Sequence, residues 1–317
     1  EILIGLVGSE MCIRDRVDTF GTGTVGDEKL EEAVALAKKA DTVLLCLGLD
    51  ELRESEGLDR SDMKLAENQQ QLLAAVAAVN PNVVVLMSAG APVETPWVGQ
   101  CRALVYGALG GQAGAGAAAD ILTGKLCPCG KLSQTWAQAH DDTPAKANFG
   151  GEGRNVEYRE GLYVGYRYYQ TAGVPVAFPF GYGLSYTTFT QKMSDITSDG
   201  SSLKFSVTVT NTGSAAGKDV VEIYNDPPYT NGGIEKASAN LLDFAKTSEL
   251  APGESETIDF TIPVEDLASY DYKNNGCYVL EAGGYIISTN SDSHNVLDSK
   301  TCLLYTSPSP RDRSVSR

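Results

Sequence analysis

The run Thr42-Val43-Leu44-Leu45-Cys46-Leu47-Gly48-Leu49 predicts a buried strand, and it decides the fold class of this chain. Acidic side chains follow the run directly, at Asp50, Glu51, Glu54, Glu56 and Asp59. In open α/β sheets, ligands bind outside the carboxyl ends of the strands. Carboxyl groups on a loop there can act as general acids or nucleophiles, because the loop exposes them and the sheet holds them. The competing interpretation is a solvated acidic loop, since charged side chains are mostly exposed.

Strands and helices alternate around this run. The expected helices are Lys29–Lys39, Asn68–Val79 and Gly114–Leu122, and the further strands are Val83–Met87 and Ala103–Leu109. Such alternation predicts an α/β fold, with a mostly parallel sheet and helices on both faces. We therefore expect an α/β sandwich domain over residues 17–190, in which the aromatic segment 136–190 wraps back over the sheet.

The helical pattern stops after residue 200. Apolar and polar residues then alternate in Leu203–Asn211, Val220–Tyr224, Thr257–Ile262 and Gly284–Ser288. Short alternating strands at this spacing predict an antiparallel β-sandwich of the immunoglobulin or fibronectin type III kind. We expect it to occupy residues 191–301.

The two ends of the chain differ from the sequence between them. Residues 1–16 and 302–317 each carry an Arg-Asp-Arg triplet and resemble translated sequencing-adapter read-through. The first segment lacks the positive charges that precede the apolar stretch of a signal peptide, and the last has too few arginines for a nucleic-acid tail. We expect both to be artefactual ends, and the natural protein to be longer.

Composition excludes several classes of protein. The length of 317 residues predicts two domains, at about 150 residues each. The formal net charge of −16 repels phosphate backbones, so we expect no nucleic-acid partner, whereas a neutral sugar is not repelled. No apolar run reaches the length of about 18 residues that a membrane span needs, so we expect no membrane partner.

The cysteines and histidines predict no metal site and no serine-hydrolase triad. Of the seven cysteines, Cys12 and Cys302 fall in the expected artefactual ends, and Cys127-Pro128-Cys129 has no second pair that would complete a zinc site. Free thiols favour a reducing compartment such as the cytoplasm. The histidines are His140 and His294, which lie far apart in the sequence, and no GxSxG serine accompanies them.

Two glycine-rich segments resemble sites that bind a dinucleotide or an anion. Gly21–Gly26 spells GxGxxG, but the strand that a dinucleotide site needs directly before it is missing, so we interpret it as a flexible linker. Gly110–Gly116 could cradle an anion at a helix start, but it lacks the lysine of a P-loop, and close packing of helix and sheet is the better explanation. We expect no cofactor.

Several blocks occur in a fixed order along the chain. They are ESEGLDR at Glu54–Arg60, GAPVETPW at Gly90–Trp97, GGQAGAGAAADILTGKLCPCGKL at Gly110–Leu132, YREGLYVGYRYY at Tyr158–Tyr169, FPFGYGLSYTTF at Phe178–Phe189, VTVTNTGSAAGKDVVEIY at Val207–Tyr224 and LAPGESETIDFTI at Leu250–Ile262. With them, residues 17–300 resemble the second and third domains of glycoside hydrolase family 3, the β-glucosidase and β-xylosidase family. The chain departs from the family pattern at Leu58, Ala113, Cys127 and Cys129.

The resemblance implies a retaining β-glycosidase mechanism with two carboxyl groups. The general acid/base of the family is a glutamate on a loop of the α/β domain, and Glu56 matches it. The nucleophile of the family is an aspartate on a TIM-type barrel domain, which this chain does not resemble anywhere. The chain is therefore expected to be a fragment that supplies the acid/base, with the barrel as a missing partner domain and a β-glycoside or oligosaccharide as substrate. The alternative is a non-catalytic carbohydrate-binding or scaffold module.

Further side chains near Glu56 could position it or contact a sugar. Glu54 could be a second catalytic carboxyl, but we favour a neighbour that holds an arginine or tunes Glu56. Asp59 and Arg60 are expected to pair and shape the loop. Trp97, with Glu94 and the tyrosines at 166, 168 and 169, could line a sugar site, against the alternative that these side chains pack in the core and between domains.

Overall fold

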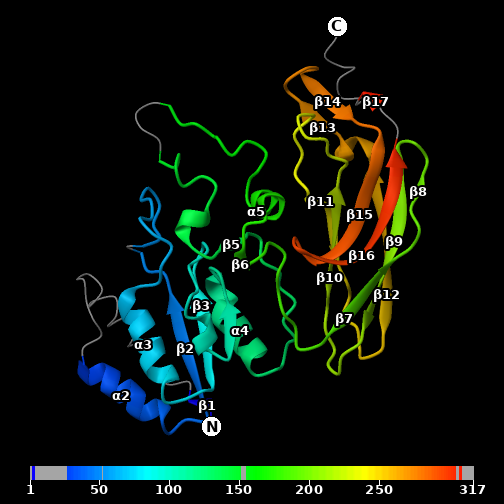
Figure 1. Cartoon of the computed structure of the whole chain (residues 1–317). Helices are drawn as coiled ribbons and strands as arrows, with labels where there is room; N and C mark the ends of the chain where they lie inside the picture. The colour runs from blue at the N-terminus through cyan, green and yellow to red at the C-terminus, as the bar shows by residue number, and fades with distance from the viewer. Residues whose placement is uncertain (1, 4–26, 52, 151–154, 305–306, 309–317) are drawn as a thin grey trace. The chain divides into compact units, whose positions relative to one another are not determined.

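The computed structural model describes residues 2–3, 27–51, 53–150, 155–304 and 307–308. The chain folds into two compact units, which are Glu1–Leu122 with Ala137–Thr143, and Thr123–Trp136 with Pro144–Arg317 (Figure 1). The second unit thus includes segments that precede residue 191, and the expected domain limits of 17–190 and 191–301 stay a prediction. The GxGxxG segment Gly21–Gly26 and Cys12 lie outside the described residues.

The first unit contains a four-stranded parallel sheet. Its strands lie in the order β1 (Ile2–Leu3), β2 (Thr42–Gly48), β3 (Val83–Ser88) and β4 (Ala103–Tyr106). All the neighbouring strands are parallel, with Val43 opposite Val83 and Val84 opposite Ala103. Val83, Val85 and Met87 are fully buried, which is why this stretch reads as an almost continuous apolar run.

The described residues of this unit form three helices. They are α2 (Asp27–Ala37), α3 (Glu67–Ala77) and α4 (Gly114–Leu122), with the short turns η1 (Val98–Gln100), η2 (Gly111–Ala113) and η3 (His140–Asp142). Helices α2 and α3 lie side by side (Figure 1). Helix α3 buries Leu72, Leu73 and Val76 at the helical spacing that the sequence predicts. That helices cover both faces of the sheet stays a prediction.

Asn80 fixes the connection between α3 and β3. Its side-chain amide donates to the carbonyl oxygens of Ala37 and Ala40, at 2.9 and 2.8 Å. Ala37 is the last residue of α2 and Ala40 follows it, where a helix leaves carbonyl groups short of donors. Asn80 follows the end of α3, so its side chain ties the ends of the two helices together.

The second unit contains the predicted antiparallel β-sandwich. One sheet has the order β11 (Asn240–Lys246), β10 (Val220–Asp226), β15 (Gly283–Asp292) and β16 (Asn295–Leu304). The other has the order β12 (Ser255–Pro263), β9 (Ser202–Asn211) and β7 (Phe189–Met193), and β8 (Thr197–Ser198) also pairs with β9. Every pairing in both sheets is antiparallel.

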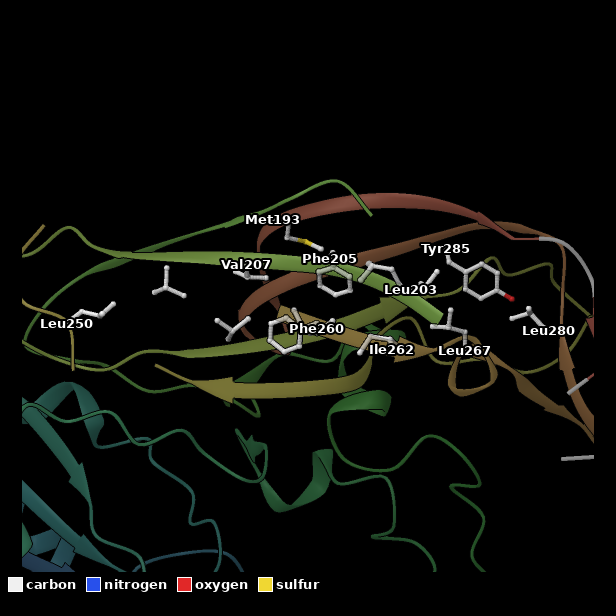
Figure 2. Packing of buried hydrophobic residues seen from close by; sticks show 14 residues of the cluster. Met193, Leu203, Phe205, Val207, Leu250, Phe260, Ile262, Leu267, Leu280 and Tyr285 are labelled. Carbon is white, nitrogen blue, oxygen red and sulfur yellow. The ribbon is translucent and has the colours of Figure 1, made fainter. Parts of the chain in front are cut away.

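Alternating side chains of these strands form the core of the sandwich (Figure 2). The core residues are Met193, Leu203, Phe205, Val207, Val209, Val221, Ile223, Leu250, Phe260, Ile262, Leu267, Leu280, Tyr285 and Ile287. Phe205 and Phe260 are cross-strand partners, and their rings stack at a centroid distance of 5.7 Å. Full burial of one such side chain contributes about 1.5–3 kcal/mol, so this cluster is the main source of stability in the unit.

Shorter elements complete the second unit. They are α5 (Tyr166–Ala172), β6 (Val176–Phe178), η4 (Val264–Leu267), β13 (Ser269–Asp271), β14 (Cys277–Leu280) and β17 (Ser307–Pro308), and β5 (Trp136–Ala137) begins in it. Strand β16 continues to Leu304, beyond the limit expected at residue 301. Cys302 and Leu304 pack against the sandwich core, because β16 stays paired with β15 up to its end.

Candidate active site

Three hydrogen bonds fix the carboxyl end of β2. The Gln69 side chain of α3 accepts from the Gly48 amide at 3.0 Å and donates to the Gly48 carbonyl at 2.9 Å. The Leu49 amide donates to the Ser88 carbonyl at 3.0 Å. A side chain at position 48 would collide with that same carbonyl, so only glycine allows β2 and β3 to approach here. The acidic loop therefore starts from a rigid point.

Asp50 turns the chain away from the sheet. Its side-chain oxygen Oδ1 accepts from the Arg53 amide at 3.0 Å, and its carbonyl accepts from the Glu54 amide at 2.9 Å. An aspartate that bonds to the backbone a few residues on is a common start of a turn. This turn brings Glu54 back toward the sheet, where its side chain is half-buried.

A second turn, Ser55–Leu58, carries Glu56. The Leu58 amide donates to the Ser55 carbonyl at 3.4 Å, and Gly57 has a φ of +79°. A positive φ at the third position of such a turn requires glycine. Glu56 is the residue before this glycine, and the structure leaves it exposed.

Two hydrogen bonds tie the loop after β2 to the loop after β3, and we call this pair the loop clamp. The Glu54 oxygen Oε2 accepts from the Gly90 amide at 2.8 Å. The Arg60 nitrogen Nη1 donates to the Pro92 carbonyl at 3.1 Å. Glu54 and Arg60 flank the turn that carries Glu56, so the clamp holds both ends of that turn.

Charges within the loop support the clamp. Burial lowers the pKa of Arg60, and the negative charges of Glu54 and Asp62 oppose that change. Arg53 lies 4.0 Å from Asp62. Tyr106 donates its hydroxyl to the Ala89 carbonyl at 2.7 Å, and burial together with the charge of Glu54 raises its pKa. The charge of Glu54 therefore acts on Arg60 and on Tyr106, and its role as a holder of an arginine stays a prediction.

The expected pairing of Asp59 with Arg60 is wrong. The structure describes both residues and shows no ion pair between them, and Asp59 is exposed. Arg60 is half-buried and donates a hydrogen bond to the Pro92 carbonyl instead. Adjacent residues in an extended segment face opposite ways, so neighbours in sequence are poor candidates for a pair.

Two of the possible sugar-stacking side chains, Trp97 and Tyr169, are buried, and Tyr166 and Tyr168 are partly buried. Trp97 is only 4% exposed, which favours the packing alternative over a sugar platform. Glu94 accepts from the His140 amide at 2.9 Å and so holds a loop. Tyr169 is buried, and the Tyr166 ring stacks on Phe180 at 4.9 Å within the second unit.

Two residues of the site were missed by the sequence analysis. Gln69 and Gly90 lie in segments that were predicted as a helix and as part of a motif, with no assigned role. Their function depends on contacts with residues 21 and 36 positions away, which no local pattern encodes.

The described residues show no support for a metal site or a membrane span, and the Gly110–Gly116 segment is closely packed. Within the described residues, no group of three or more His, Cys, Asp or Glu side chains could hold a metal ion. A side chain at Gly110 would approach the Cα of Gly114 to 2.8 Å, which fits close packing in this segment. Among the described helices, none has the length and apolar character of a membrane span.

Comparison with known proteins identifies the family. Residues 9–186 match the model of the glycosyl hydrolase family 3 C-terminal domain, and residues 219–293 match the fibronectin type III-like domain. The chain belongs to glycoside hydrolase family 3. The resemblance seen in the sequence blocks is confirmed, and the two domain types are those expected.

Several similar proteins are named as β-glucosidases. The chain is 39% identical over 279 residues to thermostable β-glucosidase B of Acetivibrio thermocellus, covering 86% of this chain and 36% of that protein. It is 40% identical over 275 residues to the β-glucosidase of Kluyveromyces marxianus, covering 86% and 32%. The chain thus spans about a third of the length of these relatives.

Solved family 3 structures share the fold. The Kluyveromyces marxianus β-glucosidase in complex with glucose matches with a TM-score of 0.84 and 37% identity, covering 89% of this chain and 34% of that one. The Bifidobacterium adolescentis β-glucosidase matches with a TM-score of 0.85 and 34% identity, covering 96% and 46%.

Proposed function

We propose that this chain is the part of a retaining β-glycosidase that supplies the general acid/base, and that Glu56 is that residue. The whole enzyme would hydrolyse terminal β-linked sugars from oligosaccharides or glycosides, as a β-glucosidase does. The observation that carries the proposal is the exposed Glu56 on a glycine turn, held on both sides by the loop clamp.

The chemistry requires such an arrangement. A retaining glycosidase uses two carboxyl groups about 5–5.5 Å apart, one to attack the sugar and one to move protons. The acid/base must reach the glycosidic oxygen first and a water later, so its carboxyl must be open to the substrate while its backbone is fixed. Glu56 meets both conditions, whereas the half-buried Glu54 is engaged with Gly90.

The nucleophile would come from a barrel domain that this chain does not include. The share of about a third that the chain covers in its β-glucosidase relatives leaves room for such a domain. The alternative function is a carbohydrate-binding or scaffold module without catalysis, in which Glu56 would be an ordinary exposed carboxylate.

Leaving-group dependence in the intact enzyme tests the assignment. Glu56→Ala should lower the turnover of an unactivated glucoside by roughly 10²–10⁴-fold, the usual contribution of general acid–base catalysis. A dinitrophenyl glucoside should lose much less in the first step, because its leaving group needs no proton.

Glu54→Ala is the matched control. It removes a carboxylate two positions away and weakens the clamp, but it should lower turnover of both substrates by the same factor. If Glu56→Ala also lowers both equally, or changes neither, the acid/base assignment is wrong and the scaffold alternative gains.

A further inference from the structure

Exposed tyrosines gather on the hairpin of β13 and β14 and on the turn between these strands, within the second unit. Tyr270 and Tyr278 are cross-strand partners on β13 and β14, with ring centroids 5.2 Å apart. Tyr272 follows β13 and is 62% exposed, and Tyr229 in the loop after β10 is 52% exposed. Aromatic side chains usually contribute their energy by being buried, so such a group on the surface calls for a partner.

A rigid turn presents Tyr272. Buried Asp271 accepts hydrogen bonds from the amides of Lys273, Asn274 and Asn275 at 3.1–3.2 Å, and from the Asn275 side chain at 2.7 Å. The Gly276 amide closes the turn on the Asp271 carbonyl at 2.7 Å. Binding costs less entropy when the contact residues are already ordered, so this turn suits recognition.

Polar groups surround the rings. Lys273 Nζ lies 3.2 Å from Glu235 Oε1 and 5.5 Å from the centre of the Tyr272 ring. The Tyr163 hydroxyl donates to Glu235 Oε2 at 3.0 Å. Burial raises the pKa of Tyr163 to about 12, and Glu235, Tyr229 and Tyr272 contribute to that rise, as expected of groups that lie near one another.

We propose that these residues, called here the tyrosine surface (Tyr229, Tyr270, Tyr272 and Tyr278, with Glu235 and Lys273), bind a neutral oligosaccharide chain. Sugar rings present apolar C–H faces and a rim of hydroxyls, and phenol rings beside paired charged groups offer the complementary apolar and hydrogen-bonding surfaces.

The charges at and around the tyrosine surface favour a neutral ligand over an anionic one. The lysine of the tyrosine surface is already paired with Glu235, so no free positive charge remains there for an anionic polymer. The net charge of −16 repels anions further. A neutral glycan meets no such barrier. The tyrosine surface shares no residue with the acid/base loop, so the inference does not depend on the role of Glu56.

Calorimetric titration of the complete chain with cellohexaose tests the tyrosine surface. The wild-type chain should show saturable binding, and because the ligand is neutral, high salt should change the dissociation constant by less than about twofold. Tyr272→Ala should weaken binding about fivefold to tenfold, the equivalent of one lost aromatic contact. Tyr272→Trp should retain binding, and Tyr270→Ala with Tyr272→Ala should abolish it.

Phe244→Ala is the control, because Phe244 is an aromatic side chain 65% exposed on β11 of the same unit, and it should bind as the wild type does. Circular dichroism of each variant shows that the sandwich is folded. The proposal is overturned if the wild-type chain does not bind, if the double variant binds unchanged, if Phe244→Ala loses as much, or if only a protein partner binds. No hydrolysis is measured, so failure here leaves the acid/base assignment untouched.

Discussion

Glu54 and Glu56 stand two residues apart and have opposite surroundings. Glu54 is half-buried and accepts from Gly90, whereas Glu56 is exposed on a turn. A carboxylate that is engaged with the backbone stabilises a loop, and one that faces solvent is free to meet a substrate. This contrast underlies the different roles that we propose for the two residues.

Stability separates the two glutamates in this chain. Glu54→Ala should lower the free energy of unfolding of the first unit by about 1–2 kcal/mol, because a hydrogen bond to a charged group is lost. Glu56→Ala should change it by less than about 0.5 kcal/mol, as is usual for exposed positions. The chain has two tryptophans, so in a Trp136→Phe background the fluorescence of Trp97 reports on this unit in urea titrations. Equal losses in the two variants would contradict the clamp.

For single residues, the sequence predicts the local backbone conformation better than it predicts which side chains contact one another. A glycine directly after Glu56 indicates a sharp turn from the sequence alone, and Gly57 has a φ of +79°. The Asp59–Arg60 pair failed, because proximity in sequence says little about which way side chains face. Trp97 could not be assigned, since a tryptophan serves equally well in a core or at a sugar site.

Elements with strong periodicity were predicted well. Helix α4 has the expected limits, and β9 buries alternate residues as its pattern requires. Strand β4 ends at Tyr106, not at Leu109, because Ala108 takes a φ of +47° and the chain leaves the sheet. Strand β16 was missed because its middle, Asp298–Thr301, is polar, none of its side chains is fully buried, and its last three residues fall in the expected artefactual end.

The turn at Gly181 is tightly fitted to strand β10. Gly181 has a φ of +83°, and a side chain there would collide with the carboxylate of Glu222. Gly181→Ala should therefore destabilise the second unit by about 1–3 kcal/mol more than Gly173→Ala. Gly173 also has a positive φ, but a side chain there would meet open space. Gly173→Ala therefore measures the cost of the backbone strain alone, which is about 1–2 kcal/mol. Urea titrations that follow Trp136 in a Trp97→Phe background measure both, and equal losses would contradict the predicted collision.

Buried Glu222 should make the second unit sensitive to pH. Burial raises its pKa to about 7, against the hydrogen bond from Tyr224 at 2.8 Å and the charge of Lys131, while Asp292 and Asp219 add to the rise. The folded state therefore holds this proton more tightly than the unfolded state, for which the pKa is 4.5. The contribution to stability is fully present below pH 4.5 and is lost as the pH rises through about 7.

Glu222→Gln tests this, because glutamine keeps the shape and cannot ionise. The variant should gain stability over the wild type as the pH rises from about 5 to about 8, by up to about 3 kcal/mol. Urea titrations at several pH values measure the difference. A difference that stays constant over this range would show that Glu222 keeps the same charge throughout.

At the scale of the whole chain, the proposed function assigns only one of the two required carboxyl groups, that of Glu56, to these residues. The purified chain should therefore show no turnover of an aryl β-glucoside, although its two units fold. The control is the same chain with Glu56→Ala, which should give the same background rate. Turnover by the wild-type chain that Glu56→Ala abolishes would mean that the nucleophile lies within these residues.

Azide rescue in the intact enzyme tests the central claim most directly. Once Glu56 is replaced by alanine, water lacks a general base in the second step, whereas azide needs none and can attack the glycosyl-enzyme intermediate. We predict that added azide accelerates Glu56→Ala with an activated glucoside and yields a β-glycosyl azide, while Glu54→Ala shows neither effect. Rescue of Glu54→Ala together with no response from Glu56→Ala would contradict the account and exchange the roles of the two glutamates.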